Sequence, residues 1–433
     1  MYSPYLLGYL PDTTWSKALS TAALVLATYL LAVLLHAQLL HPLRKYPGPL
    51  YARFTRIPFW TASLRGHGHT FLHALHERHG LVVRYSPSAV SYTEPQAAAG
   101  RRENPKASWF QLPAYNGVPS IFAVPDGGGH ARVRRAFAPA FSERSLKAQE
   151  GLFRRYADLL VARVREQAGE DERVEMVRML NYTAFDIMAE LCFGEPLGLL
   201  GMMDYSPWVA SVFAAVRMLP FLQICAYYPV LGRLLHWLEP GWAREMRGAH
   251  FRHSADRVDR RLADGSDKPD IWNLLLSEDG KGHRLTLDEM HSNAEGFMLA
   301  GTETTATLMS GLLYHLLTNP DKLALLRAEV AAYRSPANFM RPGRFAPEKW
   351  LGDAEYAADR RDALQPFSFG PRNCVGVSFA WHEVRLVVGR LVFSFDFELC
   401  EESRDWARQR VFVLWEKNPL YLRVKPFGEV RAQ

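Results

Sequence analysis

The fold of this chain is decided by the stretch Phe367-Ser368-Phe369-Gly370-Pro371-Arg372-Asn373-Cys374-Val375-Gly376, which sets one cysteine between two glycines. Gly370 and Gly376 have no Cβ, so the backbone can lie close to a flat group here. An isolated cysteine is most often a small buried side chain. An arginine two residues before Cys374 and an aromatic residue upstream favour a different role, in which the cysteine offers a thiolate to a metal.

The apolar run from Phe379 to Phe393 is expected to form a helix that begins just after Cys374. Free N–H groups and the positive dipole end of such a helix would hold the sulfur deprotonated. A thiolate ligand gives electron density to haem iron and favours cleavage of the O–O bond. The ligand type therefore indicates oxygen activation.

The spacing F-x-x-G-x-R-x-C-x-G resembles the haem-binding loop of the cytochrome P-450 family. The resemblance implies that family's fold, with haem b as the cofactor and Cys374 as the axial metal ligand. It implies that Phe367, Gly370, Arg372 and Gly376 bind the cofactor, with Arg372 paired to a haem propionate. Filamentous-fungal members are similar in three further stretches, Cys192–Pro196, Phe395–Leu399 and Leu414–Leu420.

His130 and Arg134 are four residues apart, so a helix would place them on one face. The pattern His130-x-x-x-Arg134-Arg135 resembles the family helix whose polar side chains hold the haem propionates. The alternative is a solvated basic face, because Arg132 and Arg135 lie in the same turn.

A second motif, Ala300-Gly301-Thr302-Glu303-Thr304-Thr305, lies in a helix that Thr286 and Glu289 open with capping-box spacing. The small residues Ala300 and Gly301 would let this helix pass close to a flat cofactor. The Thr304 hydroxyl can bond back to the carbonyl of Ala300.

The same motif resembles the family's oxygen-activation sequence. That resemblance implies two catalytic residues, Thr304 as the proton-delivery hydroxyl and Glu303 as the relay acid. Taken alone, a threonine-rich helix with a glycine is more often simply a packed helix. Together with Cys374, the motif favours catalysis.

Helical periodicity or helix-start signals occur over residues 70–80, 129–168, 176–193 and 285–317, whereas strand-like runs such as 81–85 are short. The predicted fold class is mainly α with minor β. Residues 202–242 are rich in aromatic side chains, for which a core role is the default. The resemblance instead places this stretch over the substrate entrance and against the bilayer, with residues 108–122 as the other wall.

The segment from Ala18 to Leu43 has no charged residue and is long enough to span a bilayer. A cleaved signal peptide is the alternative, but only Lys17 is basic before it. Basic residues are more numerous after the segment, so the rest of the chain should stay cytosolic. We therefore expect a lumenal N-terminus over 1–17, a single transmembrane anchor over 18–43, a Pro/Gly linker over 44–50 and the monooxygenase domain over 51–433. The resemblance to microsomal members implies the endoplasmic reticulum membrane.

The composition of the chain limits the kinds of molecule that it is expected to bind. The net charge of +6 is mild and the basic residues are spread out, so no nucleic-acid binding is expected. The four cysteines are widely and irregularly spaced, which does not predict a disulfide framework. No flavin or nicotinamide fingerprint is present, so electrons should come from NADPH through a separate reductase.

One block of the family is missing. Members carry a Glu-x-x-Arg helix where this chain has only the eight residues Ala331 to Asn338, too few for that helix and its following strands. Lys349 stands where an arginine is usual. Either a gene-model or splicing error removed an exon, or a damaged polypeptide exists, and the intact flanking motifs favour the first.

The resemblance implies a haem-thiolate monooxygenase that inserts one oxygen atom from O₂ into an apolar small molecule of fungal secondary metabolism. Aromatic polyketides and terpenoids are candidate substrates. One alternative is a haem-thiolate isomerase or dehydratase, against which the intact Ala300–Thr304 motif counts. The other is a catalytically impaired remnant, which the missing block favours.

Overall fold

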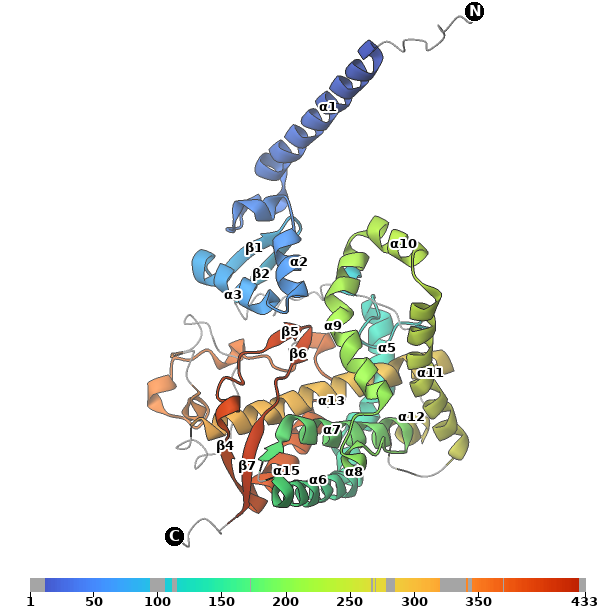
Figure 1. Ribbon diagram of the computed structural model, residues 1–433, viewed down its shortest axis with the longest axis vertical. Coiled ribbons are helices and arrows are strands. Elements are labelled where there is room, and N and C mark those ends of the chain that lie inside the picture. Colours follow the sequence, from blue (N-terminus) through green and yellow to red (C-terminus); the bar gives the residue numbers. More distant parts are fainter. Residues whose placement is uncertain are drawn as a thin grey trace, which may run out of the picture. The chain divides into compact units, whose positions relative to one another are not determined.

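The computed structural model describes residues 12–93, 106–110, 115–171, 173–265, 268, 270–277, 285–319, 340–341, 345–368 and 370–427. The chain divides into two compact units, Met1–Ala62 with Gly68–Glu94, and Ser63–His67 with Pro95–Gln433. Residues 51–62 and 68–94 thus group with the N-terminal segment, whereas the sequence placed them in the monooxygenase domain. The fold class is as predicted, mainly α with small sheets (Figure 1).

The smaller unit begins with the apolar helix α1 (Asp12–Leu35), whose side chains are exposed. Its stretch Lys17–Leu35 is long and apolar enough to cross a membrane, and it ends earlier than the predicted anchor because a π-helix takes over at His36–Leu40. The rest of the unit contains 3₁₀ turns at Pro42–Lys45 and Leu50–Arg53, helices α2 (Ile57–Leu64) and α3 (Gly68–His79), and the antiparallel strands β1 (Val82–Ser86) and β2 (Ala89–Tyr92).

The predicted Pro/Gly linker is bonded to this unit. The carbonyl of Pro47 accepts a hydrogen bond of 2.7 Å from the N–H of Arg84 in β1. A Cβ on Gly48 would lie 2.2 Å from the Arg84 carbonyl oxygen. Glycine therefore allows the chain to pass close to the strand.

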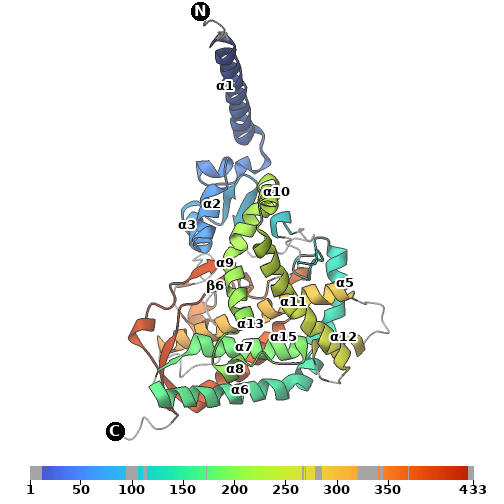
Figure 2. The same cartoon turned by 45° about the vertical axis from the view of Figure 1, so that its right-hand side comes forward.

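The larger unit is built around helix α13, which runs through its middle in both ribbon views (Figures 1 and 2). Its helices are α5 (Gly127–Phe137), α6 (Glu143–Asp171), α7 (Met176–Phe193), α8 (Leu199–Met202), α9 (Pro207–Tyr227), α10 (Pro229–Trp237), α11 (Gly241–Asp264), α12 (Ile271–Ser277), α13 (Leu287–Leu317) and α15 (Val377–Ser394). Short 3₁₀ turns lie at Ser108–Phe110, Ala138–Phe141, Pro347–Lys349, Ala354–Tyr356, Arg361–Ala363, Gly370–Arg372 and Glu401–Ser403.

Two antiparallel sheets complete this unit. The three-stranded sheet has the order β3 (Arg173–Glu175), β7 (Tyr421–Pro426), β4 (Phe395–Leu399), with Val174 opposite Leu422 and Phe397 opposite Val424. The other is a hairpin of β5 (Arg410–Phe412) and β6 (Leu414–Glu416). Both sheets bring C-terminal residues back to the helical core.

Helix α7 is the centre of the core. It packs against α13 and α6, and nearly all of its side chains are buried. It ends at Gly194, whose φ of 68° is a left-handed conformation that glycine adopts at little cost. The predicted helix over 176–193, which rested on helical periodicity, is confirmed with these bounds.

The predicted helical stretch 129–168 is divided in the structure. Helix α5 ends at Phe137, a 3₁₀ turn follows over Ala138–Phe141, and α6 begins at Glu143. Pro139 lies at the start of that turn and has no N–H to continue the α-helical ladder. The periodicity on either side was correct, but the interruption by Pro139 was missed.

Candidate active site

Cys374 lies on a closed loop in front of α15. The Cys374 N–H donates a hydrogen bond of 2.8 Å to the carbonyl of Phe367, and Gly370 adopts a φ of +76° between them. Helix α15 begins at Val377, as predicted from the apolar run. The Cys374 residue is exposed, so the loop holds its thiol at an accessible position.

Burial raises the pKa of the Cys374 thiol, although the N–H of Gly376 and the charge of Arg134 act in the opposite direction. The balance of these effects does not support the expectation that the start of the helix holds this sulfur deprotonated, because burial raises the pKa by more than the N–H of Gly376 lowers it. A bound metal ion would supply the missing stabilisation, since coordination removes the thiol proton.

Two arginines attach the cysteine loop to other segments. Arg134 of α5 donates hydrogen bonds of 2.5 Å to the Asn373 carbonyl and 2.6 Å to Asn373 Oδ1. Arg372 donates bonds of 2.8 Å to the carbonyl of Val124 and 3.2 Å to that of Pro125. Both guanidinium groups thus lie beside the cysteine, and in the structure they bind main-chain oxygens.

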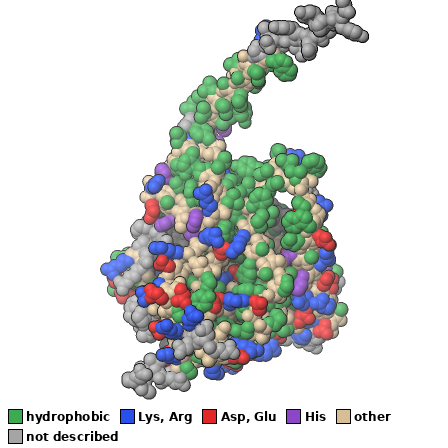
Figure 3. Space-filling model, in the orientation of Figure 1, with side chains coloured by type: hydrophobic (Ala, Val, Ile, Leu, Met, Phe, Trp, Pro, Cys, Tyr) green, Lys and Arg blue, Asp and Glu red, His purple; other side chains and the backbone are tan. Residues whose placement is uncertain are grey.

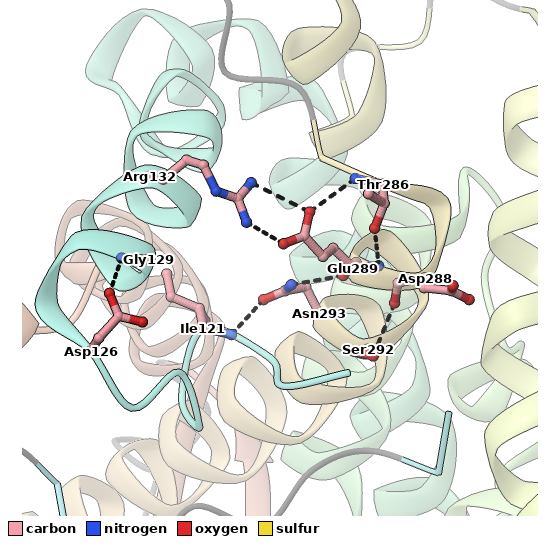
Figure 4. Close-up of polar contacts among 9 residues, drawn as sticks. All are labelled: Ile121, Asp126, Gly129, Arg132, Thr286, Asp288, Glu289, Ser292 and Asn293. Atoms are coloured by element: carbon pink, nitrogen blue, oxygen red, sulfur yellow. Dashed lines mark hydrogen bonds and ion pairs between the residues drawn. The ribbon is translucent and has the colours of Figure 1, made fainter. Parts of the chain in front are cut away.

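Helix α5 carries the other predicted basic residues. His130 is buried on the same helix as Arg134, whereas Arg135 is exposed. Arg132 forms an ion pair with Glu289 of α13 (Figure 4). Arg132 and Arg134 are two residues apart and contact different elements, α13 and the cysteine loop, so only part of the charge of this helix forms a solvated face.

The N-terminus of α13 has the predicted capping box (Figure 4). The Thr286 hydroxyl accepts a bond of 3.2 Å from the Glu289 N–H, and the Thr286 N–H donates one of 2.9 Å to the Glu289 carboxylate. Burial of Glu289 opposes ionisation, but the hydrogen bonds from Arg132 and Thr286 and the charge of Arg132 together outweigh it and lower the pKa of that carboxyl. Asn293, one turn later, accepts a bond of 2.8 Å from the Ile121 N–H.

The middle of α13 contains an accessible strip. Thr304 is exposed and Ala300 is half-buried, although neighbouring residues of the helix are buried. The Thr304 hydroxyl donates a bond of 2.6 Å to the Ala300 carbonyl, which confirms the predicted back-bond. Gly301 faces elsewhere: a Cβ there would lie 2.5 Å from Met188 Sδ, so close packing on α7 is enough to require glycine.

Glu303 is buried next to this strip. Its Oε2 accepts a bond of 2.7 Å from Lys417 Nζ, and both side chains are almost fully enclosed. Lys417 follows β6, is 114 residues away from Glu303 and was not among the predicted site residues. No local spacing connects the two residues, so only the folded chain shows the pair.

Lys349, which replaces the usual arginine, is buried among local partners. Its Nζ donates a bond of 2.7 Å to the carbonyl of Met340 and lies 4.0 Å from Asp359 Oδ2. Desolvation lowers the pKa of Lys349. The apparent deletion near 330–338, and the segment in which the Glu-x-x-Arg helix was sought, lie outside the described residues.

A flat metal-bearing cofactor fits these residues. Cys374 is exposed, and α13 contributes a strip of small and hydroxylic side chains. A Cβ on Gly376 would meet only ordinary contacts, 3.8 Å to Phe141 and 3.9 Å to Cys374 Sγ, so packing within the chain does not require glycine there. Within the described ranges, no group of three His, Cys, Asp or Glu side chains could hold a metal ion. A single thiolate ligand to a cofactor's iron suits this donor set.

Comparison with known proteins supplies the family. The family model described as Cytochrome P450 matches this chain as two segments, residues 56–334 and 331–424. The chain is 36% identical to Cytochrome P450 monooxygenase FUM2 of Gibberella moniliformis, over 88% of this chain and 97% of that protein. It is 36% identical to efuB of Hormonema carpetanum, over 89% and 92%, and 33% identical to averantin hydroxylase of Aspergillus parasiticus, over 90% and 93%.

The lengths of these alignments indicate that this chain lacks residues that its relatives have. The alignment with FUM2 is 455 residues long, although it covers 88% of a chain of 433 residues. It therefore contains positions at which the relative has residues and this chain has none. The two matches to the family model adjoin at residues 331–334.

Proposed function

The chain belongs to the cytochrome P450 family of monooxygenases, and on this premise we propose that it inserts one oxygen atom from O₂ into an apolar small molecule of fungal secondary metabolism. The observation that carries the proposal is the accessible Cys374 thiol, held on a closed loop directly before α15. The relatives named as monooxygenases and as averantin hydroxylases support the reaction class.

Haem, when bound, supplies the activation of oxygen. Cys374 would hold the iron, and the guanidinium groups of Arg134 and Arg372 lie close enough to the cysteine loop to pair with the propionates. The remaining residues proposed to contact the cofactor are Phe367, Gly370, Gly376, His130 and Ala300, whereas the predicted contact of Gly301 is not proposed further because Gly301 packs against Met188.

Thr304 and Glu303 are proposed to handle protons. The Thr304 hydroxyl is accessible and donates its own hydrogen to Ala300, so its oxygen is left to accept a hydrogen bond from water or substrate. Glu303, the next residue, is a carboxylate whose Oε1 has no hydrogen-bond partner among the described residues. A hydroxyl with an adjacent acid is suited to moving protons inward.

The substrate is proposed to be apolar and to arrive from a membrane. Helices α9 and α10 and the residues after them leave large apolar side chains exposed, and Figure 3 shows apolar side chains gathered over these helices. A core role, the default for such aromatic content, does not account for that exposure. The most exposed of these side chains are Val230, Trp237 and Trp242.

Helix α1 would anchor the protein in the endoplasmic reticulum membrane, with the catalytic domain in the cytosol. An NADPH-dependent flavoprotein reductase would then supply the electrons. The apolar stretch Lys17–Leu35 supports the anchor. The segment Pro207–Tyr227 is also long and apolar enough to cross a membrane, but it is part of the larger unit, which favours contact with a membrane surface over a second crossing.

We also propose that an internal block is missing between Val330 and Ala331. The adjoining family-model matches and the length of the alignments support this, because both indicate residues that the relatives have and this chain lacks. Sequencing the transcript across this junction decides between a gene-model error and a shortened protein. A transcript that reads directly from Val330 to Ala331 would establish the shortened protein.

The carbon monoxide difference spectrum of the reduced full-length chain tests the proposed function. We expect a Soret band at the thiolate position in the natural chain, and its loss or shift in Cys374→Ser. Cys225→Ser, a change of a half-buried cysteine in α9, is the matched control and should retain the band. An unaltered thiolate band in Cys374→Ser would contradict the assignment, and no band in the natural chain would show that it holds no stable haem.

A further inference from the structure

The hairpin of β5 and β6 lies between two helices of the larger unit. Strand β5 contacts α9, and β6 contacts α13. Glu416, the last residue of β6, lies 2.5 Å from Arg217 of α9 and 2.5 Å from Arg410 of β5. The next residue, Lys417, turns to α13. Two consecutive residues therefore contact opposite neighbours of the hairpin.

Lys417 makes two contacts with α13. Its Nζ donates bonds of 2.7 Å to Glu303 Oε2 and 3.2 Å to Thr307 Oγ1. Glu303 and Thr307 are four residues apart, so they lie on one face of the helix. Thr304, with its accessible hydroxyl, lies between them in the sequence. The ammonium group is thus fixed within one helical turn of the proposed proton-delivery residue.

The ion pair is enclosed. The side chains of Lys417 and Glu303 are 3% and 4% exposed. Lys417 engages only one carboxylate oxygen, and the other, Oε1, is buried without a hydrogen-bond partner among the described residues. A buried charge that loses its partner is strongly destabilising. Because separating Lys417 from Glu303 would leave such a charge, the two side chains are held together in one arrangement.

We infer that Lys417 is a positioning residue for the relay acid: it holds Glu303 by Oε2 and so leaves Oε1 as the oxygen that exchanges protons. This inference rests on the proposed function. A proton taken from water would arrive on Oε1 and leave towards the Thr304 oxygen, which regenerates the carboxylate. The step consumes no oxidant or reductant, and the charge on Lys417 stays in place throughout.

The first arm of the test measures thermal stability, which does not require catalytic activity. In the full-length chain, Lys417→Met should lower the midpoint of thermal unfolding by several degrees, because it leaves the Glu303 carboxylate buried without its cation. Adding Glu303→Gln should recover most of this loss, since the neutral amide needs no cation. Lys425→Met, a change of an exposed lysine in β7, is the matched control and should leave the midpoint unchanged.

Proton delivery provides the second arm, measured with haem and an NADPH-dependent reductase but without added substrate. The readout is the share of NADPH electrons recovered as hydrogen peroxide rather than as water. We expect Lys417→Met to raise the peroxide share several-fold, Lys417→Arg to stay close to the natural chain, and Lys425→Met to match it. A residue that only stabilises the fold would change the midpoint and leave the peroxide share as it was.

Three outcomes would overturn the inference. One is a peroxide share that Lys417→Met leaves unaltered, and another is additive stability losses in the double variant, which would show that the two side chains do not interact. The third is a failure of Lys417→Arg to restore the natural peroxide share. Failure of the proposed function would look different, because the natural chain itself would then show no thiolate Soret band and consume no NADPH.

Discussion

The two halves of helix α13 differ in how the rest of the protein covers them. The first half is fixed by a capping box and an ion pair from Arg132 (Figure 4), and by an aromatic cluster around Phe297. The middle of the helix leaves Ala300 and Thr304 accessible on one side, and among the described residues the Thr304 hydroxyl bonds to its own helix. One continuous helix therefore has a stabilised end and one uncovered side in its middle. The difference teaches that contacts at the N-terminal end of α13 can offset the stability that its accessible side loses through missing packing.

The largest expected effect is the loss of Phe297. Its side chain is 3% exposed, and its ring lies 4.8 Å from Phe137, 5.6 Å from Phe141 and 6.2 Å from Phe122. Phe297→Ala should lower the free energy of unfolding by about 3–5 kcal/mol, because it leaves a cavity in the core. Denaturant unfolding measures this. Phe393→Ala, on a ring that is 82% exposed, is the control, and equal losses in both variants would break the comparison.

Glu383 of α15 tests the middle of α13, where its carboxyl interacts with Thr305. Burial raises the pKa of Glu383 to about 8, so the folded chain holds its proton more tightly than the unfolded chain does. Stability should therefore fall as pH rises from the unfolded pKa towards the folded one. Between pH ~5 and ~8 the natural chain should lose about 3–4 kcal/mol more stability than Glu383→Gln does.

Unfolding curves at several pH values check this expectation. Glu398→Gln, a change of an exposed carboxylate in β4, should keep the natural pH dependence. A Glu383→Gln chain that loses stability as steeply as the natural one would show that another group titrates in this range.

A smaller effect is expected at the capped end. Glu289→Ala removes the cap interaction and the partner of Arg132, and should lower the free energy of unfolding by about 1–2 kcal/mol at neutral pH. The pKa of Glu289 is lowered in the folded chain, so its contribution is present above the unfolded pKa and is lost as pH falls through the folded value. The difference between the natural chain and Glu289→Ala should therefore shrink at pH ~3. Arg135→Ala, at an exposed position in α5, is the control.

The smallest expected change in stability is at Thr304. Thr304→Ala removes an exposed hydroxyl and should alter the free energy of unfolding by less than about 0.5 kcal/mol. Thr302→Ala, in the same motif, removes a hydroxyl that is fully buried and donates to Met298, and should cost more. The peroxide share should show the reverse order, with Thr304→Ala the more affected. If both variants lose equal stability, the middle of the helix is not uncovered.

Much of the site could be predicted because its signals are local. The capping box, the back-bond from Thr304 to Ala300 and the start of α15 behind Cys374 each depend on residues within a few positions of one another. The bounds of α7 followed from its helical periodicity in the same way. The break at Pro139 was also a local signal, and it was overlooked within a long periodic stretch.

Other features had no local signal. Gly301 was expected to make room for a cofactor, but the structure places Met188 of α7 against it. Arg134 was expected to bind propionates, and the structure shows it holding Asn373, 239 residues away in the sequence. Nothing in the spacing of either motif names these partners, because they come from elements that meet only when the helices pack.

The sequence by itself determined the mainly helical fold and singled out Cys374, Thr304 and Glu303 as candidate site residues, since each of these follows from residue type and short-range patterns. Only the tertiary structure decided which side of α13 is uncovered and which cation holds Glu303. The physical reason is that burial and ion pairing depend on the distance between side chains in space. Chain folding brings Lys417 to within 2.7 Å of Glu303 across 114 residues, and no repeat or motif encodes that approach.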